Sequence, residues 1–224
     1  LVQHAEAIRK PLAANDLTGA RRALSMIVSR DTATLDESEI VRGGVESIAE
    51  NLIDAVTSAL FWAVAGYLAG GAAGAAGAAV LLRAVNTLDA GWGYKNERYL
   101  AFGRAAARID DAAHFIPARL TVPAIALAAL LLRGSFGRTF LMALRHRHDH
   151  PSPNSCYGMA GFAGALRIRL GGPTVYNGVT EPYPYWGEGR AELTPDDLCR
   201  AELLAVAATL FFTLILLAIT EVLW

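Results

Sequence analysis

Three carboxylates, Glu46, Glu50 and Asp54, recur at every fourth position and therefore share one face of a predicted helix. Asp54 directly precedes 28 uncharged residues, and a carboxylate beside a membrane-length run is energetically costly and usually functional. Mg²⁺ prefers hard oxygen ligands and commonly binds one or two carboxylates together with phosphate oxygens. The pattern indicates either a site for metal and phosphate or a solvated network in which Arg42 pairs with Glu46.

A second polar segment, residues 86–119, holds five Lys or Arg residues and four acids between apolar runs. Lys95 would bind phosphate as a point charge and Arg98 as a fork, while Asp110 and Asp111 would bind a second metal or cap a helix. The alternative is a loop whose basic and Tyr side chains anchor it at lipid headgroups. The other donors and acceptors of this segment are Asn86, Asp89, Tyr94 and Asn96.

A third polar segment, residues 146–155, contains three alternating histidines, which would share one face of an extended chain as metal ligands do, or lie in a solvated turn. Pro151 and Pro153 fix the backbone and so place Ser152 and Asn154 rigidly, as a binding element requires. The sequence has no GxSxG motif, no Ser/His/Asp order and no P-loop, so neither a hydrolase nor a familiar nucleotide site is indicated.

These segments are carried by a chain of 224 residues, of which 54% are hydrophobic and 18% charged. The mean hydropathy of +0.33 is high for a soluble protein, and the net charge of −1 gives no indication of nucleic-acid binding. The two cysteines form no CxxC motif, which favours a reduced protein. Because the chain starts at Leu1 without Met, we expect preceding sequence to be missing.

Residues typical of helix N-termini mark three predicted helix starts. Asp16 predicts the start of a helix over residues 17–29, and Asp36 with Glu39 forms a capping-box pattern for the helix that carries the three acids. Towards the C-terminus, Thr194 with Pro195 predicts the start of a helix whose residues 203–220 are apolar.

Three uncharged runs favour an all-α, polytopic integral membrane protein of a single domain over residues 1–224, with polar loops forming the site. Residues 55–82 fit one tilted span or a hairpin of two short helices, and Gly70 with Gly74 forms a GxxxG helix-packing motif. Residues 120–132 are short for a full span, and only residues 166–176 suggest strands. The alternative is an Ala-rich soluble bundle.

The polar segments also resemble a known family. Blocks at residues 30–36, 45–54, 86–119, 150–155 and 163–172 closely resemble the CobD/CbiB family of cobalamin biosynthesis, above all YKNERY and HPSPNS. The resemblance implies a multi-pass protein of the inner membrane with adenosylcobinamide-phosphate synthase activity. Such an enzyme uses ATP to attach aminopropanol, or aminopropanol phosphate, to adenosylcobyric acid through an amide bond. The family usually has a further hydrophobic N-terminal region.

The resemblance also implies roles for the polar residues. ATP-dependent amide formation implies Mg²⁺, cations on the phosphates and a base for the amine proton. Glu46, Glu50, Asp54 and Asp110 would be catalytic, and Glu50, Asp54 and Asp111 would hold metal. The substrate or its phosphate would be bound by Arg30, Asp31, Asn86, Asp89, Tyr94, Lys95, Asn96, Arg98, Arg119, His150, Ser152 and Asn154. The implied partners are the lipid bilayer and other membrane proteins of cobalamin assembly.

Two departures favour rival functions. After HPSPNS, the family usually has Gly and, three residues later, Glu, where this chain has Cys156 and Met159. A non-catalytic membrane sensor or structural homologue, as in the AmpE-type proteins, is therefore one alternative, and a transporter with Gly-broken helices is another.

A single site also needs Asp54 and Asn86 on one side of the membrane, which the hairpin would provide.

Overall fold

The computed structural model describes residues 2–92 and 100–223. In chain order the helices are α1 (Val2–Ala13), α2 (Leu17–Ser25), α3 (Glu37–Asn51), the π-helix η1 (Leu52–Thr57), α4 (Ser58–Trp92), α5 (Leu100–Leu131), α6 (Phe136–Arg145), α7 (Ser155–Leu166) and α8 (Pro195–Leu223). Between α7 and α8 lie four short strands, β1 (Leu170–Gly171), β2 (Thr174–Tyr176), β3 (Val179–Glu181) and β4 (Tyr185–Trp186). The fold is therefore all-α apart from two small antiparallel pairs, β1 with β4 and β2 with β3.

The predicted helix starts are confirmed. Asp16 accepts a hydrogen bond from the Gly19 N–H, and Asp36 and Glu39 make both bonds of the capping box at the start of α3. At the start of α8, Asp197 accepts from the backbone N–H of Thr194 at 2.8 Å. Helix α2 ends at Ser25, four residues before the predicted end.

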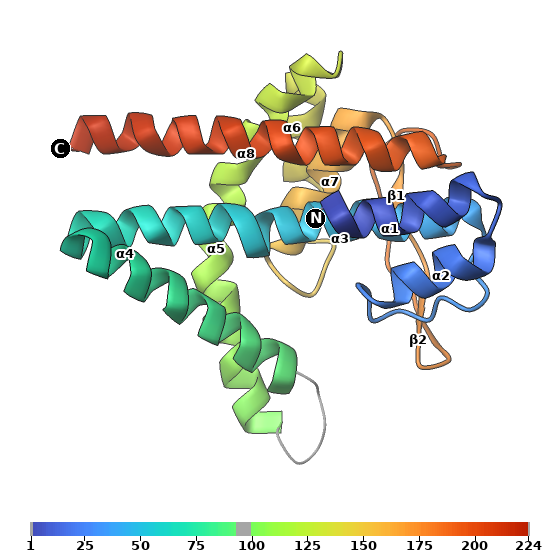
Figure 1. Cartoon of the computed structure of the whole chain (residues 1–224), viewed down its shortest axis with the longest axis horizontal. Coiled ribbons are helices and arrows are strands. Elements are labelled where there is room, and N and C mark those ends of the chain that lie inside the picture. Colours follow the sequence, from blue (N-terminus) through green and yellow to red (C-terminus); the bar gives the residue numbers. More distant parts are fainter. Residues whose placement is uncertain (1, 93–99, 224) are drawn as a thin grey trace.

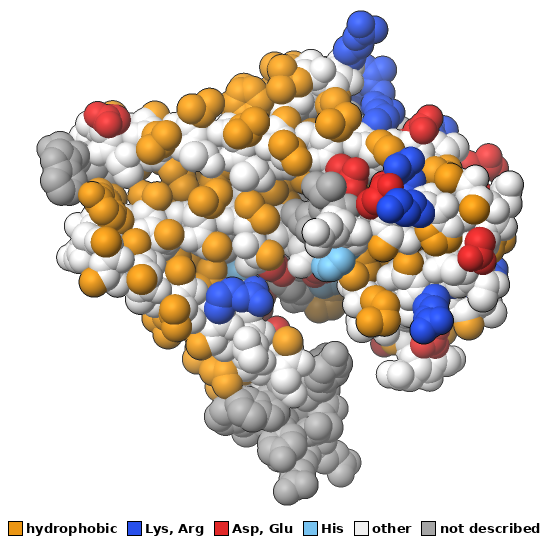
Figure 2. Space-filling model, in the orientation of Figure 1, with side chains coloured by type: hydrophobic (Ala, Val, Ile, Leu, Met, Phe, Trp, Pro, Cys, Tyr) orange, Lys and Arg blue, Asp and Glu red, His pale blue; other side chains and the backbone are white. Residues whose placement is uncertain are grey.

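Long apolar helices make up half of the molecule. Among the described residues, three helical segments are long and apolar enough to cross a membrane: Glu37–Gly91, Gly103–Leu131 and Pro195–Val222. In Figure 1, α8 runs beside the continuous rod formed by α3, η1 and the first part of α4, and α5 crosses both. Figure 2 shows hydrophobic side chains over the exposed faces of α4 and α8, while charged side chains gather over the end where α1 and α2 lie. The prediction of an all-α membrane protein is confirmed.

Helix α4 is a hairpin of two arms. Gly70 and Gly71 leave helical geometry, and Gly71 has φ of +60°, a conformation that glycine adopts without strain. The turn is visible at the left of Figure 1, beside the label of α4. Beside it the arms meet at Gly66 and Gly74, where a Cβ on Gly74 would lie 2.1 Å from the Gly66 carbonyl oxygen. Of the two sequence-based alternatives the hairpin is correct, but the close pair is Gly66 with Gly74, because Gly70 forms the turn instead.

Helix α5 differs from the expectation of a short apolar span. Residues 120–132 belong almost entirely to a single helix of 32 residues, which continues through Pro117 and Pro123. The segment expected to be a polar loop, residues 86–119, is helical wherever the structure describes it. Its polar side chains therefore lie on helix faces, where neighbouring helices can hold them more rigidly than a loop would.

The core lies where α7 is enclosed by α3, α5, α6 and α8. Every residue of α7 is buried. A Cβ on Gly158 would lie 2.7 Å from the Ala49 carbonyl oxygen, so α7 packs directly on the backbone of α3. The apolar stripe of α3 and η1 faces this core, with Val41, Val45 and Leu52 fully buried. The acids of α3 lie on another face of the helix, where they line a cavity.

Candidate functional site

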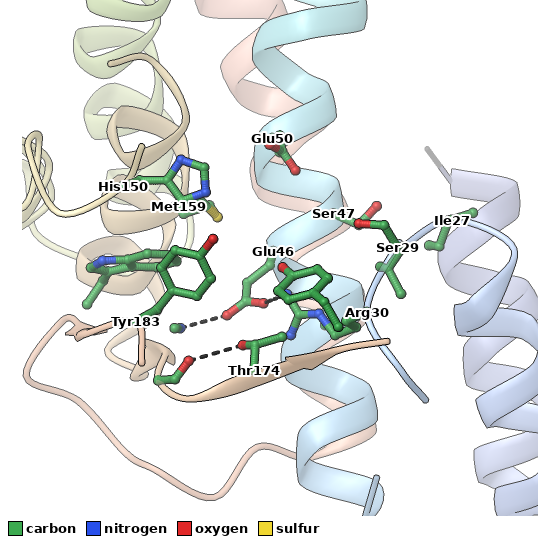
Figure 3. A pocket seen from close by; sticks show the side chains of 16 residues that line it. Ile27, Ser29, Arg30, Glu46, Ser47, Glu50, His150, Met159, Thr174 and Tyr183 are labelled. Carbon is green, nitrogen blue, oxygen red and sulfur yellow. Dashed lines mark hydrogen bonds and ion pairs between the residues drawn. The ribbon is translucent and has the colours of Figure 1, made fainter. Parts of the chain in front are cut away.

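A cavity of about 550 Å³ lies beside α3, and we refer to it as the α3 cavity. Its walls come from the segment before α3, from α3 and α7, from the residues around His150 and from the strands. Figure 3 shows Glu46 and Glu50 one turn apart on the same face of α3, with Arg30 on one side and His150 and Tyr183 on the other. The i, i+4 spacing read from the sequence is what directs both carboxylates into one space.

Arg30 and Glu46 form a buried ion pair inside this cavity. The second carboxylate oxygen of Glu46 accepts from the backbone N–H of Gly171 at 2.6 Å, which ties α3 to β1. Burial by itself lowers the pKa of Arg30, but the attraction and the hydrogen bond of Glu46 outweigh it and raise the pKa above its ordinary value. Glu46 is therefore satisfied on both oxygens, and its charge is balanced by Arg30.

His150 stands on the opposite wall against aromatic rings. Its ring stacks on Tyr183 with centroids 5.6 Å apart and meets Trp186 edge-on at 6.1 Å. The Ser152 N–H donates to His150 Nδ1 at 3.1 Å, so the neutral ring carries its proton on Nε2. Burial lowers the pKa of His150. The ring is thus a neutral group near pH 7.

A second polar assembly, the His114 cluster, joins η1, α4 and α5 and consists of His114, Ser58, Asn86, Asp110 and Asp54. His114 is 1% exposed, and its Nδ1 lies 2.6 Å from Ser58 Oγ. Its Nε2 lies 2.8 Å from Asn86 Nδ2 and 3.4 Å from Asp110 Oδ1. Asp54 Oδ1 lies 3.8 Å from Nδ1. The cluster brings Asp54 and Asn86 to the same side, as the hairpin prediction required.

Asp111 anchors residues 150–154, which we call the HPSPN segment, to α5. Its side chain accepts from Ser152 Oγ at 2.9 Å, and its carbonyl oxygen accepts from Asn154 Nδ2 at 2.8 Å. Arg119 donates to Asn154 Oδ1 at 3.3 Å and lies over the rings of Phe115 and Tyr157. The structure thus brings Asp111, which the sequence assigned to metal, together with Ser152, Asn154 and Arg119, which it assigned to the substrate or its phosphate.

Glu50 connects the two regions. It lines the α3 cavity, accepts from Ser155 Oγ at 3.3 Å, and lies one turn before Asp54 on the same helical rod. Asp89 lies one turn beyond Asn86 on α4. Asp31 does not line the cavity; it is exposed and accepts from the Gly178 N–H at 2.7 Å, in the turn between β2 and β3. Tyr94, Lys95, Asn96 and Arg98 lie outside the described residues.

Metal binding by three protein side chains is not indicated. Within residues 2–92 and 100–223, no group of three His, Cys, Asp or Glu side chains is placed to hold an ion. Of the alternating histidines, His146 bonds to Asp149 at 2.7 Å, and only His150 lines the α3 cavity. The acids assigned to metal are divided, since Glu50 faces the cavity, Asp54 the His114 cluster and Asp111 the HPSPN segment.

Sequence reasoning missed His114, Ser58, Tyr183 and Trp186. His114 follows Asp110 by four residues and so shares its helix face, which is a usable signal. Ser58 lies four residues beyond Asp54 in the same way. Tyr183 and Trp186 gave no signal in the sequence. The segment that holds them reaches the cavity because β4 pairs with β1.

Fold and site together define an α-helical membrane protein whose acids and amides gather where its long helices meet. A family model described as CobD/Cbib protein matches residues 1–219, and the chain belongs to this family. No solved structure matches.

Three curated relatives illustrate the similarity. The chain is 42% identical over 215 residues to "Cobalamin biosynthesis protein CobD" of Klebsiella pneumoniae, covering 96% of the chain and 65% of the relative. It is 40% identical over 210 residues to the CobD protein of Leptospira interrogans, covering 94% and 64%. It is 40% identical over 219 residues to "Cobalamin biosynthesis protein CbiB" of Salmonella typhimurium, covering 97% and 66%. The chain therefore spans about two thirds of the length of these relatives.

Proposed function

We propose that this protein acts in cobalamin biosynthesis as an adenosylcobinamide-phosphate synthase, an acid–amine ligase that joins aminopropanol or its phosphate to adenosylcobyric acid. The observation that carries the proposal is that α3, η1 and α5 direct acids into three adjoining polar places, namely the α3 cavity, the His114 cluster and the HPSPN segment. The names of the relatives supply the pathway.

Amide formation needs an unprotonated amine, so one carboxylate must accept a proton from the ammonium. Glu46 is occupied by Arg30 and Gly171, and in our proposal it holds the cavity wall in place. Glu50 and Asp54 remain as candidate bases. Asp110 and His114 would keep Asn86 oriented towards the same region.

ATP and Mg²⁺ remain part of the proposal. When bound, they would convert the carboxylate of adenosylcobyric acid into a better acyl donor. Oxygen donors suited to Mg²⁺ are present at Asp54 and Asp110, which both lie within 4 Å of His114. Arg30 is less suited to phosphate than the sequence suggested, because Glu46 already balances its charge. Phosphate binding would then fall to Lys95, Arg98 and Arg119.

We also propose a multi-pass location in the inner cell membrane, where other membrane proteins of cobalamin assembly would be its partners. The exposed apolar side chains of α8 support contact with lipid, for example Leu210 at 62% and Val222 at 85% exposure.

The test is formation of the amide product. Asp54→Ala, Lys95→Ala and Asp110→Ala would each be assayed by mass spectrometry with adenosylcobyric acid, ATP, Mg²⁺ and either amine. We expect Asp54→Ala to lose at least about a hundredfold in rate, the lower range for a general acid or base. Asp110→Ala and Lys95→Ala should also lose rate, through weaker binding of Mg²⁺ and phosphate. Glu37→Ala, an exposed acid at the start of α3, is the matched control. Survival of product formation in all three variants would refute these roles.

A non-catalytic homologue is the second candidate, and Met159 is the observation that favours it. Met159 is 4% exposed and lines the α3 cavity, at the position where the family resemblance predicts a carboxylate. If the wild-type protein forms no product but Met159→Glu does, the chain is a homologue that has lost its activity.

A further inference from the structure

The α3 cavity is lined by two acidic side chains, Glu46 and Glu50, and by one basic side chain, Arg30. Arg30 balances Glu46, which leaves Glu50 as the remaining charged side chain of the wall. Within the part of the chain that the structure describes, no Lys or Arg nitrogen lies within 4 Å of Glu50, whose carboxyl group accepts one hydrogen bond, from Ser155. His150 adds no positive charge near pH 7, because burial lowers its pKa.

A carboxylate that lines a cavity without a partner cation is costly, since desolvation of the charge is not compensated by an opposite charge. A ligand that brings a positive charge would remove this cost. An anion would increase it, which argues against the cavity as a phosphate site.

Aromatic rings also line the α3 cavity. Tyr183 stacks with His150 and meets Tyr176 edge-on, with ring centroids 6.5 Å apart. Aromatic faces attract cations through the ring quadrupole, and sites for ammonium ligands are commonly built from such rings. Hydroxyl groups of Ser29, Ser47 and Tyr183 line the same space and can bond to a neutral oxygen of the ligand.

We infer that the α3 cavity binds a small amino alcohol, with its primary ammonium at Glu50 between the aromatic rings and its oxygen among the hydroxyl groups. The identification of this ligand as aminopropanol rests on the proposed function. A three-carbon amine fills only part of about 550 Å³, so room remains for the carboxyl group that it would attack.

The experiment measures binding and requires no turnover. The protein in lipid nanodiscs would be titrated with aminopropanol, with aminopropanol phosphate and with propanediol, which has the same size but lacks the ammonium. We expect propanediol to bind at least about tenfold more weakly than the better of the two amines, because it cannot form the charge-assisted bond. Equal binding of propanediol would overturn the inference without any variant being needed.

Two pairs of variants refine the test. Glu50→Gln keeps the shape of the side chain and should weaken amine binding by about tenfold, whereas Glu37→Gln on the same helix should have no effect. Tyr183→Leu should weaken binding while Tyr183→Phe retains it, because the ring and not the hydroxyl attracts the cation. Unchanged affinity in Glu50→Gln would also overturn the inference.

The outcomes separate the two proposals. Glu50-dependent amine binding without any amide product would support the amine site and refute the ligase. Product formation with an unchanged KM for the amine in Glu50→Gln would support the ligase and refute the amine site.

Discussion

Asn86 donates from its side-chain nitrogen to Asp110 Oδ1 at 2.7 Å, and this bond fastens the second arm of the α4 hairpin to α5. The same nitrogen lies 2.8 Å from His114, whose other ring nitrogen lies 2.6 Å from Ser58 on the first arm. Both arms of the hairpin are therefore held to α5 by one histidine and one amide. Residues from distant parts of the sequence become neighbours through these two side chains.

Replacing Asn86 should release the second arm. In Asn86→Ala, Asp110 and His114 lose their shared donor, and we expect a loss of about 1–3 kcal/mol in the free energy of unfolding. Denaturant or thermal unfolding in detergent would measure it. Thr87→Ala is the control, because the exposed Thr87 hydroxyl bonds to the Arg83 carbonyl oxygen of its own helix.

Gly74 should tolerate no side chain. A Cβ there would lie 2.1 Å from the Gly66 carbonyl oxygen, so Gly74→Ala must push the arms apart, at a cost of about 1–3 kcal/mol. Gly77→Ala meets nothing within 4 Å and should be neutral or stabilising by up to about 1 kcal/mol, since alanine favours helix. Comparison of the two melting temperatures tests the hairpin, and equal values would contradict the close contact.

Thr34 and Ala90 should lie on the same side of the membrane, because the hairpin returns α4 to the level of Asp54. Both positions are exposed, so single cysteines there can be labelled with a membrane-impermeant maleimide in a Cys199→Ser background. Cys156 stays as an internal silent thiol, because it is buried and burial raises its pKa to about 12. Labelling from opposite sides would exclude the hairpin topology.

Arg30 should matter for stability as well as for the site. In Arg30→Met the Glu46 carboxylate remains buried without its cation, and we expect a loss of about 3–5 kcal/mol. The double variant Arg30→Met/Glu46→Leu should recover part of that loss, because no isolated charge is left. Arg22→Met, an exposed arginine on α2, serves as the control. A double variant as unstable as Arg30→Met would argue that packing, not charge, is responsible.

His150 should make the free energy of unfolding depend on pH below about 6.5. Its folded pKa lies below the ordinary 6.5, so between these two values the unfolded chain binds more protons, and stability falls as pH falls. Above about pH 7 this contribution is constant. The pKa of His150 is also affected by its neighbours. The charges of Glu46 and Asp111 partly oppose the lowering of this pKa, and the Tyr183 ring stacks on the imidazole.

The check is the melting temperature of wild type and His150→Gln from about pH 5 to pH 8. The wild-type protein should lose more stability than the variant as the pH drops below 6.5. Parallel curves would show that other groups cause the acid sensitivity.

Local features could be predicted from the sequence because they depend on residues a few positions apart. The caps at Asp16 and Asp36 and the helix start after Thr194 follow from residues that bond to the backbone of the first turn. The shared face of Glu46 and Glu50 follows from helical periodicity. The apolar runs indicated membrane-length helices in the same way. The order of the polar blocks was also sufficient to indicate the family.

Tertiary structure decided which polar residues meet. Helical periodicity placed Glu46, Glu50 and Asp54 on one face, but Glu46 is balanced by Arg30, Glu50 faces the α3 cavity and Asp54 faces His114. Only the turn at Gly70 and Gly71 brings Asn86 back towards Asp54. A buried charge is governed by whichever partner the fold delivers to it, and partners delivered by helices from distant parts of the chain leave no trace in local spacing.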